Sequence, residues 1–332
     1  MKFFIHNLNL YIPQNFDLTI LWRSKIVKMI YLWQIIKLMR MPIVLAVTPM
    51  FLVGTLFALL RGAPFVLLNF LWGVSILFII EIAAAFANDY FDYEADKYNK
   101  QFGFSGGSGV LLQYPELRLF AKWTSILLMI VAILLTVLLT WFLTFPLWSI
   151  GYILIAVFFC WFYTAPPLRL VYRGFGELPH FLAAIMFPGW GYLLMTKTID
   201  LNLLIFAIPF GFLGLTVILN FEIPDREADI HGGKQNFIVR FGRARSFLII
   251  NCLYLLAACL FVVYALTNVL LLSINLWIPT LFFFIPFLVS FPAALKNNPT
   301  KETATPLAIR NAIAGFIAVL LTTLYCIIII LT

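Results

Sequence analysis

Carboxylates gather at two places in the chain. Eight of its 14 acidic residues form two short clusters, namely Asp89, Asp92, Glu94 and Asp96 in the first and Glu222, Asp225, Glu227 and Asp229 in the second. Residues four apart share one face of a helix. Asn88, Asp92 and Asp96 have this spacing, and so do Asp225 and Asp229. The pattern predicts two helix ends that each present aligned carboxylates.

Aligned carboxylates of this kind predict a bound cation. Like charges four residues apart destabilise a helix by about 0.2–0.5 kcal/mol per pair. Oxygen ligands without His or Cys favour a hard ion, Mg²⁺ or Ca²⁺. Because Mg²⁺ usually binds one or two carboxylates and completes its shell with substrate phosphates, we predict two facing acidic helix ends that bind a diphosphate through Mg²⁺. The alternative is that both clusters are solvated charges at a membrane edge.

Basic and aromatic residues near these clusters fit the same chemistry. Cations stabilise the charge that grows on a departing diphosphate, and the candidates are Lys97, Arg169, Arg173 and Lys234. Each is alternatively an ordinary anchor at the membrane surface. Aromatic faces stabilise a cation by about 0.5–2 kcal/mol each, as an allylic carbocation would need. The aromatic candidates are Phe86, Tyr90, Tyr163, Tyr172 and Phe221.

Glu81 lies inside a long apolar run, two helical turns before Asn88. An ionisable side chain at such a depth in a membrane is a functional candidate by default. Two roles remain open for it. It either binds the acceptor substrate or takes up its proton, or it forms a structural hydrogen bond between helices.

The composition shows what kind of protein must position these residues. The chain has 332 residues, of which 63% are hydrophobic and 11% charged, and its mean hydropathy is +1.02. A soluble domain has about 25% charged residues, so this chain is predicted to be a polytopic membrane protein in contact with lipid. The net charge of +8 does not indicate nucleic-acid binding, because the basic residues are scattered between apolar runs.

We predict nine transmembrane helices, because the apolar runs are continuous and show no alternation typical of a β-barrel. The expected spans are 42–60, 65–88, 123–144, 146–163, 179–196, 201–220, 246–267, 270–294 and 311–331. They make one membrane domain over residues 41–332, preceded by a segment over residues 1–40. The fold class is therefore all-α.

The basic residues also predict an orientation. With nine spans, 20 of the 22 Lys and Arg residues fall on one side, and only Arg61 and Lys197 fall on the other. The side rich in Lys and Arg is normally cytoplasmic, so the N-terminus and the acidic clusters are expected there and the C-terminus on the opposite side.

The segment before the first span has helical periodicity. Its apolar residues Trp22, Ile26, Met29, Trp33 and Ile36 predict a helix lying in the cytoplasmic interface. The alternative is an extension of the first span.

Together these motifs resemble the UbiA superfamily of intramembrane prenyltransferases, from about residue 36 to the C-terminus. NDYFDYEAD, Asn88–Asp96, resembles the NDxxDxxxD motif, and DREAD, Asp225–Asp229, resembles DxxxD. Gly233–Lys234 and VRFG, Val239–Gly242, look like the motif that follows, although Gln235–Asn236 departs from it. YTAPPLRLVYRGFGE, Tyr163–Glu177, is most similar to the menaquinone branch, which prenylates 1,4-dihydroxy-2-naphthoate.

The resemblance implies a nine-helix bundle around a central cavity that opens laterally to lipid. It implies Mg²⁺-dependent transfer from a polyprenyl diphosphate to a small aromatic acceptor. By motif position, the residues that hold the Mg²⁺–diphosphate are Asn88, Asp89, Asp92, Asp96, Asp225 and Asp229, with Lys234 on the diphosphate.

Three other functions remain open from the sequence: a prenyltransferase that acts on a non-quinone acceptor, a terpene cyclase and an ion-coupled transporter. In a terpene cyclase, the same ionisation is followed by capture of the cation within its own chain. In an ion-coupled transporter, repeated acidic clusters bind the ion, but here the charges lie at one membrane edge and not at the midplane.

Overall fold

The computed structural model describes residues 29–99, 102, 105, 107–270, 272 and 274–332. This part of the chain is helical and contains no strand. In chain order the helices are α2 (Met41–Ala46), α3 (Thr48–Leu60), α4 (Leu67–Phe91), α5 (Tyr93–Asp96), α6 (Val110–Gln113), η1 (Pro115–Leu117), α7 (Arg118–Phe142), α8 (Trp148–Phe162), η2 (Leu170–Arg173), α9 (Glu177–Thr196), α10 (Leu201–Glu222), α11 (Arg226–His231), α12 (Phe237–Thr267), α13 (Trp277–Ala294) and α14 (Lys301–Leu331).

Each predicted span corresponds to a helix, with α2 and α3 together forming the first, so the predicted all-α membrane fold is confirmed. Within the described residues, eight helices are long and apolar enough to cross a membrane, against nine predicted. The difference is α8, which has 15 residues and spans about 22 Å at 1.5 Å per residue. Prolines close to both of its ends, Pro146 and Pro166, fall where the chain leaves the helix.

Several helices begin directly after a residue whose side chain caps the helix N-terminus. These starts do not coincide with the start of the apolar run. Helix α12 begins at Phe237, because Asn236 Oδ1 accepts a hydrogen bond from the Val239 N–H at 3.0 Å. Helix α14 begins at Lys301 after Thr300, whose hydroxyl accepts from the Thr303 N–H at 3.5 Å. Both starts lie well before the predicted positions 246 and 311. Hydropathy locates only the apolar part of a helix, whereas a cap satisfies its free N–H groups.

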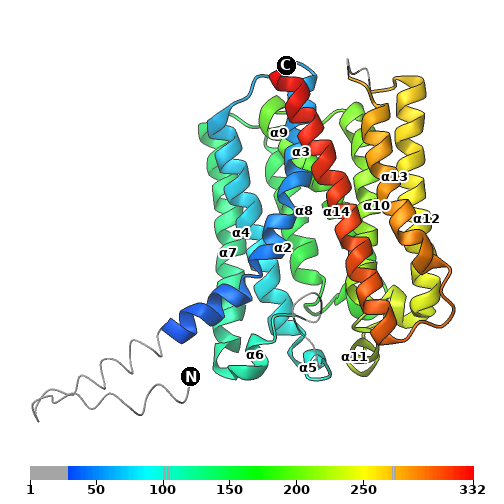
Figure 1. Cartoon of the computed structure of the whole chain (residues 1–332). Coiled ribbons are helices and arrows are strands. Elements are labelled where there is room, and N and C mark those ends of the chain that lie inside the picture. Colours follow the sequence, from blue (N-terminus) through cyan, green and yellow to red (C-terminus); the bar gives the residue numbers. More distant parts are fainter. Residues whose placement is uncertain (1–28, 100–101, 103–104, 106, 271, 273) are drawn as a thin grey trace, which may run out of the picture.

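The helices form one bundle (Figure 1). Helix α3 packs against α9, α9 against α10 and α10 against α12, and the series returns to α3 through α13 and α14. Helices α4, α7 and α8 pack on one another and join this group where α4 and α8 meet α9. Glycines permit the closest crossing: a Cβ on Gly54 would lie 1.8 Å from Pro188 O, and one on Gly191 2.2 Å from Phe51 O. Small residues bring membrane helices close in this way.

A helix also precedes the bundle over residues 29–38. Arg40, with φ of 50°, separates it from α2. The predicted apolar face is exposed at Met29, Trp33 and Ile36, whereas Tyr31, Ile35 and Leu38 pack on residues of α6 and α7. Trp22 and Ile26 lie outside the described residues.

This first helix leaves the bundle at an angle, at the end where α5, α6 and α11 lie and away from the C-terminus (Figure 1). The angle favours a separate amphipathic helix over an extension of the first span. Its position in the membrane interface, and the division of the chain at residue 40, stay predictions.

Candidate active site

A cavity of about 750 Å³ lies inside the bundle. It is lined by residues of α2, α3, α4, α8, α9, α10 and α14, and its walls are mainly apolar. Its size is typical of a site for a small organic ligand, since such pockets measure about 300–1,000 Å³. At the end of the bundle where α5 and α11 lie, polar side chains from several segments reach this cavity.

Both acidic clusters lie at this end and face each other. Asp89 lies in α4, Asp96 in α5 and Asp92 between them. Asp225 precedes α11 and Asp229 lies in it. All five are buried residues that line the cavity. Lys234 lies between the clusters, with its Nζ 3.1 Å from Asp92 Oδ2 and 3.3 Å from Asp229 Oδ1. One ammonium therefore contacts a carboxylate of each motif.

Backbone hydrogen bonds keep the carboxylates of each cluster in line. The Asp92 N–H donates to Asn88 O at 2.9 Å, and the Asp96 N–H donates to Asp92 O at 2.8 Å. The helical repeat therefore continues from α4 into α5, although the chain bends at Asp92. In the second cluster the Asp229 N–H donates to Asp225 O at 2.8 Å. The spacing of four thus places the side chains on one face in both clusters, as the sequence predicts.

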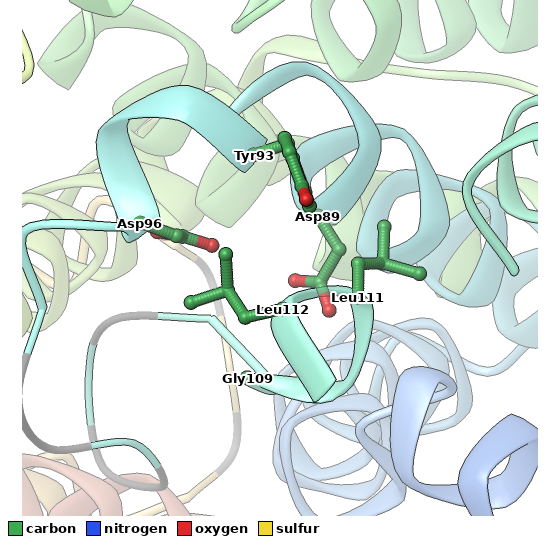
Figure 2. Close-up of a pocket in the computed structure, with 6 residues that line it drawn as sticks. All are labelled: Asp89, Tyr93, Asp96, Gly109, Leu111 and Leu112. Carbon is green, nitrogen blue, oxygen red and sulfur yellow. The ribbon is translucent and has the colours of Figure 1, made fainter. Parts of the chain in front are cut away.

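Ser105, Gly107 and Ser108, described residues of the connection between α5 and α6, contact the acidic clusters. The Ser105 hydroxyl donates to Asp225 Oδ1 at 3.0 Å, and Ser108 donates to Asp89 through both its hydroxyl and its N–H. A Cβ on Gly107 would lie 2.7 Å from Asp96 Oδ2. Figure 2 shows Asp89 and Asp96 facing one small space that Gly109 and α6 close. The sequence did not identify these serines, because nothing in their local pattern relates Ser105 to Asp225 or Ser108 to Asp89.

Burial makes the negative charges of the site costly. Burial, with added repulsion from Asp92, raises the pKa of Asp96 to about 8. Burial and repulsion from Asp229 raise the pKa of Asp225 to about 6. Burial disfavours the charged form of Lys234, but Asp92 and Asp229 outweigh it and raise the pKa of Lys234 well above its usual value. Further cations that bind at this site therefore stabilise its ionised carboxylates.

The side chains at the mouth of the cavity fit Mg²⁺ that takes part of its ligands from a substrate. Among the described residues, no three His, Cys, Asp or Glu side chains are arranged to hold a metal ion by themselves. Carboxylates are nevertheless present on both sides of the cavity mouth, and Mg²⁺ commonly binds one or two carboxylates together with phosphate oxygens. The site therefore fits Mg²⁺ that arrives with a phosphorylated substrate.

Most of this chain matches one known protein family. The model of the UbiA prenyltransferase family matches residues 47–320. The chain belongs to the UbiA prenyltransferase family. The predicted enzyme class, a prenyltransferase, is confirmed, which leaves the transporter alternative without support. Comparison with the curated proteins gives no match.

Solved structures share the UbiA fold at low sequence identity. A UbiA homolog from Archaeoglobus fulgidus bound to GPP and Mg²⁺ has a TM-score of 0.62 and 16% identity, over 87% of this chain and 99% of that chain. A digeranylgeranylglyceryl phosphate synthase has a TM-score of 0.61 and 19% identity, over 89% and 98%. An apo UbiA homolog from Aeropyrum pernix K1 has a TM-score of 0.61 and 15% identity, over 86% and 98%.

In this UbiA-family chain, three further predicted residues reach the cavity. Asn88, Glu81 and Tyr163 line it, and Asn88 Oδ1 accepts from the Thr164 hydroxyl at 3.2 Å. No hydrogen bond to the Glu81 carboxyl is found within the described residues, so the structure offers no support for a bond between helices there.

Three predicted cations lie outside the cavity lining. Lys97 is exposed, and its Nζ lies 2.7 Å from Glu94 Oε2. Arg173 is exposed and donates to Pro167 O at 2.8 Å. The Arg169 guanidinium stacks over the Tyr172 ring, 3.9 Å from its centre. The structure thus brings Lys234 to the acidic clusters and leaves these three cations at the surface.

The aromatic candidates divide in the same way. Tyr163 and Phe221 line the cavity, and the Tyr172 hydroxyl donates to Asp92 Oδ1 at 2.8 Å. Phe86 and Tyr90 instead face α6 and α7, because they lie two residues from Asn88 and Asp92 and so about 200° around the helix. Other rings form the wall: Phe159, Phe187, Trp190 and Phe316.

Besides Ser105 and Tyr152, sequence reasoning missed four polar residues that line the cavity, Arg40, His180, Glu222 and Asn236. Nothing in the local pattern distinguishes Arg40 and His180 from ordinary residues of the membrane surface. Glu222 belongs to the second cluster, but its position there implies no role. Asn236, a departure from the family pattern, donates to Asp229 Oδ2 at 2.8 Å. The pattern around Lys234 contained a signal for Asn236, whereas the other three depend on how distant helices pack.

Proposed function

We propose that this chain transfers the prenyl group of a polyprenyl diphosphate to a small aromatic acceptor inside the membrane, with Mg²⁺ as its cofactor. The observation that carries the proposal is the position of Lys234, which contacts Asp92 and Asp229 at the mouth of an apolar cavity. Negative and positive groups at the mouth suit a metal-bound diphosphate, and the apolar walls suit a prenyl chain. The Mg²⁺ and GPP bound to the Archaeoglobus fulgidus homolog support the same assignment.

The polar residues at the mouth prepare the departure of the diphosphate. When bound, Mg²⁺ neutralises the diphosphate and makes it a better leaving group. Asn88, Asp89, Asp92, Asp96, Asp225 and Asp229 hold the metal–diphosphate, and Lys234 adds a positive charge where the leaving group gains a negative one. The C–O bond to the prenyl chain then breaks, and the diphosphate leaves with the electron pair.

The aromatic wall receives the cation that remains. Tyr163, Phe221 and Phe159 present ring faces or edges to the cavity, and such rings stabilise a cation where water is excluded. A ring carbon of the acceptor attacks the cation and then loses its proton. For the acceptor we propose a quinone precursor, because Tyr163–Glu177 resembles the menaquinone branch. The digeranylgeranylglyceryl phosphate synthase among the similar structures makes a non-aromatic acceptor the main alternative.

The test is product analysis by mass spectrometry. Purified protein is incubated with Mg²⁺, prenyl diphosphates of several lengths and a panel of aromatic and glycerol-phosphate acceptors. We expect a prenylated aromatic product, and its loss when EDTA removes divalent ions or when Asp92→Ala or Asp225→Ala is introduced into a protein that stays folded. Full activity after either change would contradict the proposal. A cyclic hydrocarbon formed from prenyl diphosphate alone would instead identify a terpene cyclase.

A further inference from the structure

One carboxylate in the cavity differs from the aspartates of the two motifs. Glu222 ends α10, lines the cavity and is 5% exposed. Neither of its carboxylate oxygens has a hydrogen-bond partner among the described residues. The nearby ammonium is engaged elsewhere, since Lys234 contacts Asp92 and Asp229. A buried carboxylate without a partner is unfavourable, so this one is expected to receive a donor from a ligand.

Four aspartates of the two motifs, Asp89, Asp92, Asp225 and Asp229, have partners for their carboxylates, which separates them from Glu222. Asp92 accepts from Tyr172 and contacts Lys234, Asp225 accepts from Ser105, and Asp229 accepts from Asn236. These contacts hold their oxygens towards the mouth of the cavity. The carboxyl oxygens of Glu222 can therefore accept hydrogen bonds from a ligand, because no described residue of the protein donates to them.

The cavity that Glu222 lines also contains a second hydrogen-bond acceptor and an aromatic edge. The His180 Nδ1 lies 3.0 Å from Gly176 O. A carbonyl oxygen only accepts, so Nδ1 carries the proton and Nε2 of the neutral ring is left as an acceptor. The Tyr163 and His180 rings meet edge to face with centres 5.1 Å apart. Glu222 and both of these rings line the same cavity.

Two hydrogen-bond acceptors in a cavity with aromatic walls favour a ligand that is aromatic and carries a hydrogen-bond donor. We propose that Glu222 and His180 form the acceptor subsite and that Glu222 receives a hydrogen bond from a hydroxyl group of the acceptor. This inference rests on the proposed function. It narrows the acceptor to aromatic molecules with a free O–H group.

The test measures binding and not turnover. The wild type is loaded with Mg²⁺ and geranyl thiodiphosphate, a slowly reacting analogue, and titrated with 1,4-dihydroxynaphthalene or with its dimethyl ether, which lacks O–H donors. Both titrations are repeated without the analogue. The variant is Glu222→Gln, which keeps the shape of the side chain, and the matched control is Glu302→Gln at an exposed position on α14.

We expect Glu222→Gln to weaken binding of the diol about tenfold, which corresponds to about 1.4 kcal/mol. Binding of the dimethyl ether and of the thiodiphosphate should not change, and the control should match the wild type throughout. If Glu222→Gln does not stay folded by size exclusion and thermal melting, His180→Phe keeps a ring and removes the acceptor nitrogen. It should then weaken diol binding several-fold and spare the ether.

Two results would overturn the inference. One is equal affinity of the wild type and of the folded variant for the diol. The other is a loss of thiodiphosphate affinity in Glu222→Gln as large as in Asp92→Asn, which would make Glu222 a metal ligand. Failure of the proposed function looks different, because the wild type itself would then bind no Mg²⁺–thiodiphosphate, while the titrations without the analogue would still report on Glu222.

Discussion

Lys234 is the side chain on which the electrostatics of the mouth of the cavity depend. It is the cation that contacts Asp92 and Asp229 at 3.1 and 3.3 Å, and its side chain is 14% exposed. Without a ligand it neutralises part of the acidic charge. With a diphosphate in place, the same ammonium is positioned to stabilise the leaving group.

Replacing Lys234 tests this assignment. Lys234→Met should lower the rate of prenyl transfer by about 10²–10³-fold, the usual cost of losing one preorganised donor to a developing anion. It should also lower the melting temperature of the protein in EDTA, because two buried carboxylates lose their partner. Steady-state kinetics and thermal melting measure the two effects. Lys296→Met, at an exposed lysine, is the control, and equal rates in both variants would contradict the role.

Gly107 gives a second prediction at the scale of the residue. Its φ is +75°, and a Cβ there would lie 2.7 Å from Asp96 Oδ2 and 3.3 Å from Asp89 Oδ1. Gly107→Ala should therefore weaken binding of Mg²⁺–thiodiphosphate by about tenfold or more, because the methyl group displaces the carboxylates. The control is Gly62→Ala, which has a φ of +88° and open space around it. Titration calorimetry should show normal affinity in the control. An equal loss of affinity in both variants would mean that backbone strain, and not contact with the carboxylates, causes the effect.

At the scale of the element, Arg243 connects the second acidic cluster to α12. Its Nε donates to Ile223 O at 2.9 Å, and its guanidinium donates to both carboxylate oxygens of Glu227. The arginine is buried, and the preceding Gly242 has φ 77° and ψ 169°, which breaks the helix at this point. The bend lets the first turn of α12 follow the loop from Lys234 while Arg243 holds the end of α10.

This arrangement predicts coupling between Arg243 and Glu227. Arg243→Leu should lower the melting temperature more than Glu227→Gln, since it also leaves Ile223 O without its donor. Residues in direct contact usually couple by about 0.5–3 kcal/mol, so the double variant should melt close to Arg243→Leu alone. Strictly additive shifts in a double-mutant cycle would show that the pair does not act as a unit. The affinity for Mg²⁺–thiodiphosphate should fall together with the melting temperature, because Asp225 lies between the two anchors, Ile223 and Glu227, and Asp229 follows two residues after Glu227.

At the scale of the whole molecule, the basic residues are divided unequally between the two ends of the bundle. Arg61 and Lys197, the two basic residues expected on the other side, lie at the end of the bundle opposite the acidic clusters, where Arg61 pairs with Asp200 at 3.3 Å and Lys197 donates to Leu143 O. The C-terminus lies at that end too, and α5, α6 and α11 lie at the other (Figure 1). Because positive residues are retained on the cytoplasmic side, the mouth of the cavity is predicted to face the cytoplasm.

Reporter fusions in a bacterial host test this orientation. Alkaline phosphatase fused after Thr332 should be active, since the enzyme folds only outside the cytoplasm, and green fluorescent protein at the same position should stay dark. A fusion within the exposed turn at Lys296–Asn298, between α13 and α14, should give the opposite pair of signals. Active phosphatase at both positions, or a fluorescent C-terminal fusion, would contradict the predicted orientation.

The sequence by itself determined the class of fold and the two acidic motifs. Both depend on short-range patterns: about 20 apolar residues span the hydrocarbon core, and a spacing of four puts Asp225 beside Asp229 on one helix face. It also identified Lys234, through its position after the second motif. None of these conclusions needed a contact between distant segments.

Only the tertiary structure decided which residues share the cavity. Lys234 reaches both acidic clusters and Arg40 lines the same space, while Lys97, Arg169 and Arg173 stay outside the lining. It also joined Ser105 to Asp225 across 120 residues and left the oxygens of Glu222 without a partner among the described residues. The reason is physical: the partner of a buried polar group is set by how helices far apart in the chain cross and pack, and neither hydropathy nor spacing along one helix contains that information.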